Sequence, residues 1–138
     1  MFKLVAERAG ICTLGYDDSV NAVVITWLIN DDDVFRPMLE EQLRLVLLHG
    51  AASVIVDTAV VKGVLNSANQ AWMAKDFFPR MSVSGVRALI SVVPESAIAL
   101  MLNRRSFRDR EVGFSMVEVA SLAEAMTEAA RYNELNIT

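Results

Sequence analysis

The sequence has little of what small proteins use for covalent cross-links or metal centres. Its 138 residues include one cysteine, Cys12, and one histidine, His49. A single cysteine excludes an internal disulfide and a zinc site built from cysteines, and it is typical of a reducing compartment. No glycine-rich phosphate loop, nucleophile elbow or cluster of metal ligands is present. We therefore expect no enzyme activity, no cofactor and no metal site.

Long apolar runs and an excess of positive charge are also missing. The chain is 54% hydrophobic, but charged residues interrupt its apolar blocks within about 10 residues, which excludes a membrane span. Residues Met1 to Gly10 carry Lys3, Glu7 and Arg8, a pattern unlike a secretory signal. The net charge of −4 disfavours nucleic-acid binding. These patterns predict a cytoplasmic protein.

What the sequence does contain is an alternation of strand and helix patterns in a chain of single-domain size. Short β-branched and apolar runs predict strands at Ile11–Tyr16, Asn21–Leu28, Ser53–Asp57, Arg87–Val93 and Glu111–Val119. Helical spacing predicts helices at about 33–49, Ser67–Phe78, Glu95–Arg105 and Leu122–Tyr132. No repeat or linker divides residues 1–138 into more than one domain.

The order ββαβαβαβα predicts an α/β fold with a mostly parallel central sheet flanked by helices. The run at Ser53–Asp57 has three consecutive β-branched apolar residues instead of an alternating pattern, as in a strand buried on both faces, and we place it at the centre of the sheet. Gly50 marks the end of the first helix, with His49 as a partner of the helix dipole. Cys12 lies among apolar neighbours, so we expect its thiol to be buried.

A strand ending in Asp57 followed by residues 66–70, NSANQ, resembles the signature of STAS domains, the bacterial anti-sigma-factor antagonists. In that family an Asp-Ser-(Ser/Ala)-Gly-Leu motif opens a helix, and a partner kinase phosphorylates its serine. Ser67 and Ala68 match this motif. Its aspartate, glycine and leucine are replaced by Asn66, Asn69 and Gln70.

A divergent STAS/SEC14-like bacterial branch of the same SpoIIAA-like (STAS) fold is more similar still. The resemblance covers roughly residues 20 to 132 and rests on Trp72, Pro79, Gly85-Val86-Arg87 and the segment from Phe114 through Ala130. It implies a non-enzymatic module that docks a protein partner, such as a kinase or an anti-sigma-like regulator. Because the wider fold family includes lipid carriers, a small apolar ligand is the alternative function.

The resemblance implies that Ser67 is the phosphorylation site and that the partner contacts Asp57, Asn66, Ser67, Asn69 and Trp72. Two plainer interpretations stay open. Ser67 is typical of an ordinary helix N-cap, worth about 1 kcal/mol, and Asp57 is typical of a residue that caps a turn.

Two further features concern the surface. Arg104, Arg105, Arg108 and Arg110 form a cationic patch, which indicates either a solvated loop or a site for an anion or acidic partner. Helical spacing cannot bury all the large apolar residues of the helix that starts at Ser67, so at least one should be exposed. This set comprises Trp72, Met73, Phe77, Phe78 and Met81. The apolar excess also favours a homodimer.

Overall fold

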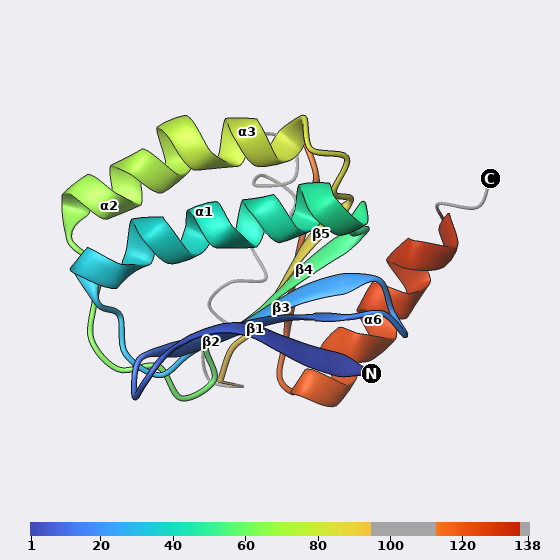
Figure 1. Cartoon of the computed structure of the whole chain (residues 1–138), viewed down its shortest axis with the longest axis horizontal. Coiled ribbons are helices and arrows are strands. Elements are labelled where there is room, and N and C mark those ends of the chain that lie inside the picture. The colour runs from blue at the N-terminus through green and yellow to red at the C-terminus, as the bar shows by residue number, and fades with distance from the viewer. Residues whose placement is uncertain (95–112, 136–138) are drawn as a thin grey trace.

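The computed structural model describes residues 1–94 and 113–135 (Figure 1). Its core is one six-stranded sheet in the order β1-β2-β3-β4-β5-β6. The first three strands pair antiparallel and the last four pair parallel. The strands are Phe2–Arg8 (β1), Cys12–Asp17 (β2), Ala22–Trp27 (β3), Ser53–Asp57 (β4), Ala88–Val92 (β5) and Ser115–Val119 (β6). The predicted α/β architecture with a largely parallel sheet is therefore confirmed.

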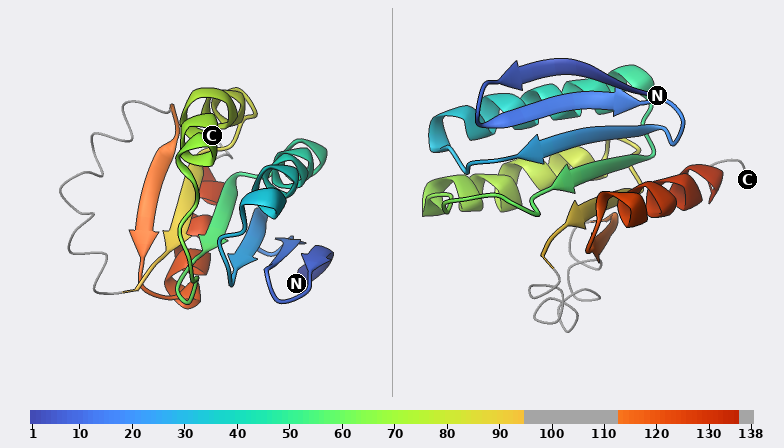
Figure 2. Two further views of the ribbon diagram at one scale, coloured as in Figure 1. Left: turned by 90° about the vertical axis from the view of Figure 1, so that its left-hand side faces the viewer. Right: turned by 90° about the horizontal axis from the view of Figure 1, so that it is seen from below.

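Helices cover both faces of this sheet. The α1 helix (Asp32–His49) lies on one face beside a continuous helical rod made of α2 (Ser67–Trp72), the π-helix η1 (Met73–Phe77) and α3 (Phe78–Ser82). The α6 helix (Leu122–Glu134) lies on the opposite face, against β4, β5 and β6 (Figures 1 and 2). The predicted helix at Glu95–Arg105 and the arginine patch lie outside the described residues.

The strand order predicted from the sequence lacks β1. This strand lies at one edge of the sheet. One extra residue, Val5, stands between Leu4 and Ala6 and shifts the register of β1 against β2. It packs closely on Gly15, where a Cβ atom would meet the ring of Phe2 at 2.5 Å. The chain thus begins βββα rather than ββα. Of residues 1–10, Phe2–Arg8 form this edge strand.

Local signals set the bounds of α1 as predicted. The Asp31 carboxylate caps its first turn by accepting hydrogen bonds from the backbone N–H groups of Asp33 and Val34, at 2.9 and 3.0 Å. Gly50 ends the helix in the left-handed conformation, at φ 60°. The His49 ring lies 3.9 Å from the Tyr16 ring and nearly parallel to it, so packing on β2 also holds this helix end.

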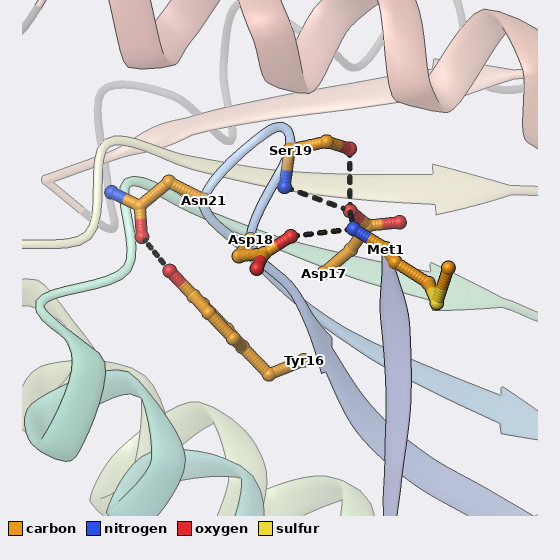
Figure 3. A network of polar contacts seen from close by, with 6 residues as sticks. All are labelled: Met1, Tyr16, Asp17, Asp18, Ser19 and Asn21. Atoms are coloured by element: carbon orange, nitrogen blue, oxygen red, sulfur yellow. Dashed lines mark hydrogen bonds and ion pairs between the residues drawn. The ribbon is translucent and has the colours of Figure 1, made fainter.

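The turn between β2 and β3 is held by polar side chains (Figure 3). Asp17 accepts hydrogen bonds from the N–H and the hydroxyl of Ser19, at 3.0 and 2.5 Å. Burial alone would raise the pKa of Asp17, but these two bonds, together with the nearby N-terminal ammonium group of Met1, outweigh it and lower that pKa. The Tyr16 hydroxyl donates to the Asn21 side chain at 2.5 Å. These hydrogen bonds fix the register in which β2 pairs with β3.

The core has two parts because successive strand residues point to opposite faces of the sheet. Leu14, Ile25 and Val54 face α1 and the helical rod, whereas Val24, Ile55 and Ile90 face α6. Cys12 is 1% exposed, which confirms its predicted burial, and that burial raises the pKa of its thiol. Within residues 1–94 and 113–135, no helix combines the length and apolar character that crossing a membrane requires.

Candidate ligand pocket

A cavity of about 220 Å³ lies between the sheet and the helices on the α1 face. Four strands, α1, the helical rod and two loops contribute its walls. From the sheet come Trp27, Val56, Leu89, Ser91 and Met116; from the helices Phe35, Leu39, Gln42, Met73, Phe77, Phe78 and Met81; and from the loops Asn30, Thr58 and Leu65. None of these residues carries a charge, so the walls that the described residues form are apolar with a few neutral polar groups.

The π-turn in the helical rod decides which side chains reach this cavity. The N–H of Phe78 donates to the carbonyl of Met73, five residues earlier, as in a π-helix. The wider turn brings Trp72 and Phe77 into contact with their ring centroids 5.5 Å apart. Such turns are frequent at functional sites.

The expectation that one large apolar residue of this helix is exposed is therefore wrong. Phe77 and Met81 are buried, and Trp72, Met73 and Phe78 are half-buried. The expectation assumed regular α-helical spacing, whereas the extra residue of the π-turn rotates the following residues back toward the sheet. All five side chains consequently belong to the inner side of the rod.

Gln42 is the functional candidate that the sequence analysis missed. It is 1% exposed and lines the cavity from α1. Its amide Nε2 donates a weak hydrogen bond to the Met81 sulfur at 3.9 Å, and its Oε1 accepts none from any residue that the structure describes. A buried acceptor left unpaired costs about 1–3 kcal/mol. The signal in the sequence was a glutamine one turn after Met38 on the apolar face of α1.

The predicted partner contacts Asn66 and Asn69 belong to a structural cluster that we call the α1–α2 clasp, made of Asp32, Arg36, Asn66 and Asn69. Asn69 is 4% exposed. Its Nδ2 donates to the Asp32 carboxylate at 2.9 Å, and its Oδ1 accepts from Arg36 Nε at 2.7 Å. Asn66 Oδ1 accepts from the N–H of Asn69 at 2.7 Å. The clasp fastens the start of the helical rod to the start of α1.

A second fastening lies further along the same two helices. The Arg80 guanidinium donates to both oxygens of Glu40 at 2.8 and 2.7 Å and to Asp76 at 2.9 Å. The hydrogen bond from Arg80 lowers the pKa of Glu40. Trp72 lies between the two fastenings, with the guanidinium groups of Arg36 and Arg80 at 5.2 and 5.9 Å from its ring centroid. The helical rod, which forms one wall of the cavity, is thus held to α1 at two places along its length.

Asp57 and Ser67 are not members of the α1–α2 clasp. Asp57 is half-buried, and its Oδ1 accepts from the N–H of Ala59 at 3.1 Å, so it caps the turn that follows β4. Ser67 is exposed and is the first residue of α2, after the actual N-cap, Asn66. Within the described residues the Ser67 hydroxyl makes no hydrogen bond. The cap that the sequence allowed at Ser67 is therefore one residue earlier.

No metal site competes with the cavity in the described part of the chain, where no three His, Cys, Asp or Glu side chains gather to hold an ion. Comparison with protein-family models, with curated proteins and with solved structures found no match. The function is accordingly argued from the site itself.

Proposed function

We propose that this protein binds a small apolar molecule in the cavity between the sheet and the helical rod. The observation that carries the proposal is a space of about 220 Å³ whose described walls are uncharged and mostly apolar side chains. Ligand sites are typically apolar hollows with a few placed polar groups. This cavity has that composition.

The volume also limits the size of the ligand. A cavity of about 150 Å³ lined by aliphatic and aromatic side chains binds benzene. Scaled from benzene, 220 Å³ accommodates about nine non-hydrogen atoms. A single ring with a short substituent, or two fused rings, has this size, whereas a full-length lipid does not fit.

Calorimetric titration with benzofuran, a fused two-ring molecule of that size, tests the proposal. At about 0.5 kcal/mol per atom, within the range known for small ligands, the dissociation constant is expected near 1 mM or below. A Ser91→Phe variant should lose this binding, because the larger side chain extends from β5 into the cavity.

The matched control is Ser115→Phe, which places the same side chain on β6 away from the cavity. It should bind benzofuran as the wild type does. Both variants are first checked for cooperative unfolding. The proposal is wrong if the wild type does not bind benzofuran, or if a folded Ser91→Phe variant binds it as tightly as the wild type.

We further propose that the chain is a divergent STAS-like module, with docking of a protein partner at the start of α2 as a second candidate function. The sequence resemblance around Asp57 and Ser67 supports the assignment. The observation that favours docking is the exposed Ser67 hydroxyl, which makes no hydrogen bond within the described residues. A kinase of the partner system could modify it without breaking the cap at Asn66.

This second candidate requires that Ser67 tolerate negative charge. We expect Ser67→Asp to leave the free energy of unfolding within about 0.5 kcal/mol of the wild type, since acidic residues are favourable in the first turn of a helix. Asn66→Ala, the matched variant, should cost about 1 kcal/mol through loss of the cap. Urea unfolding measures both. A Ser67→Asp variant that is the less stable of the two would rule out this phosphate switch.

A further inference from the structure

We infer that the Ser91 hydroxyl makes a hydrogen bond to the ligand of this cavity, and that the ligand is a small neutral aromatic molecule with one hydrogen-bonding group, as in an indole or a phenol. The inference rests on the proposed function and specifies the chemistry of the same cavity.

Ser91 faces the cavity because of its place on β5. Side chains of a strand alternate between the two faces of the sheet. Ile90 and Val92 face α6, whereas Leu89 packs on the α1 side. Ser91 therefore points to the α1 side as well, where it lines the cavity together with Leu89. The residue is half-buried, so part of its surface stays accessible to a small molecule.

The Ser91 hydroxyl also has its hydrogen-bonding capacity free, since it makes no hydrogen bond within the described residues. Other polar side chains of the cavity are engaged or closed off. Thr58 Oγ1 and Asn30 Nδ2 each donate to a backbone carbonyl at 2.9 Å, and Gln42 is 1% exposed. A serine hydroxyl can both donate and accept. It can thus pair with an N–H, an O–H or an acceptor atom of the ligand.

The walls that the structure describes favour a neutral ligand. None of their residues is Lys, Arg, His, Asp or Glu. Burying an ion without a partner is far more costly than burying a neutral polar group. Fatty acids, amines and phosphate esters are thus poor candidates for this space.

The same walls favour an aromatic ligand over an aliphatic one. Four of the lining residues are aromatic, and three others are methionines. Edge-to-face ring contacts each contribute beyond the burial of apolar area, and sulfur contacts at ring edges add to them. A flat ring between these side chains gains more than a chain of equal volume.

Indole and indene make a matched test, because they share shape and size while only indole carries an N–H. NMR titration gives the dissociation constant of each for the wild type and for Ser91→Ala. Comparing the ratio of the two constants between the proteins cancels the difference in hydrophobicity between the molecules and isolates the hydrogen bond. We expect Ser91→Ala to shift this ratio about three- to tenfold against indole, the size of one hydrogen bond. Ser91→Thr keeps a hydroxyl on the same carbon, and its ratio should stay within about twofold of the wild type.

The matched control is Ser115→Ala, the same change on β6 away from the cavity, which should keep the ratio of the wild type. If neither molecule binds the wild type, the pocket itself is wrong. If both bind but the ratio is unchanged in folded Ser91→Ala, the pocket stands and the role of Ser91 is overturned; the N–H then pairs elsewhere, for example with Asn30 Oδ1. An equal shift in Ser115→Ala, or a Ser91→Thr ratio equal to that of Ser91→Ala, also overturns the role of the hydroxyl.

Discussion

The Phe77→Ala variant is expected to lose about 3–5 kcal/mol of unfolding free energy, the usual cost of deleting a buried phenyl ring. Phe77 is 1% exposed and contacts the rings of Trp72 and Phe78. Its side chain also borders the cavity, so the space it leaves joins an existing one and the surroundings have little with which to fill it. We therefore expect a loss at the upper end of this range.

Urea unfolding followed by tryptophan fluorescence measures this loss. Leu47→Ala is the matched control, because Leu47 is 61% exposed on α1 and its removal should change stability by no more than about 0.5 kcal/mol. A loss below 1 kcal/mol for Phe77→Ala, similar to that of the control, would mean that the rod does not pack on the sheet as described.

The second large effect is expected for Asn69→Leu, at about 2–3 kcal/mol. Leucine has the same number and branching of heavy side-chain atoms as asparagine but no polar atom, so the variant loses the hydrogen bonds from Asn69 to Asp32 and from Arg36 to Asn69. Hydrogen bonds to charged groups contribute about 1.5–3 kcal/mol. The helical rod should detach first at α2, where the clasp lies.

Gln70→Leu provides the comparison for Asn69→Leu, since it is the next residue, exposed, and makes one hydrogen bond to the Leu65 carbonyl. It should cost less than about 1 kcal/mol. Equal stabilities for the two variants would remove Asn69 from the structural cluster and return it to the surface that a partner could contact. Thermal unfolding and hydrogen exchange of the α2 amides are the measurements.

The sequence predicted those parts of the fold in which the local pattern and the tertiary environment agree. Ser53–Asp57, with three consecutive β-branched apolar residues, is indeed a strand between two others, β3 and β5. The α1 helix has its cap at Asp31 and its left-handed glycine at position 50. In both cases the local sequence pattern favours the same secondary structure that packing in the folded protein requires.

The sequence could not predict β1 for a physical reason. An edge strand contacts the sheet along one side only, and most of Phe2–Arg8 is exposed. The extra residue between Leu4 and Ala6 also breaks the two-residue alternation by which strands are recognised. The strand is fixed by its pairing with β2 and by the close approach of Phe2 to Gly15.

The candidate site was the least predictable part. Residue types indicated Ser67 and Asp57, but Gln42 joins the pocket only because the fold brings its α1 position next to Met81, 39 residues later. The inward position of the five large residues of the rod depends on one π-turn, which has no sequence signal of its own. Both features come from long-range packing, which single-residue preferences do not contain.

The strictly consecutive order of the six strands has a consequence for how the chain folds. Each new strand finds its neighbour in the one that precedes it, so the sheet can grow from one edge as the polypeptide leaves the ribosome. The α6 helix, however, is made after every strand that it covers. Until then Val24, Ile55 and Ile90 lack the contacts that α6 makes with this face of the sheet, and the nascent protein is expected to present the kind of apolar surface that chaperones bind.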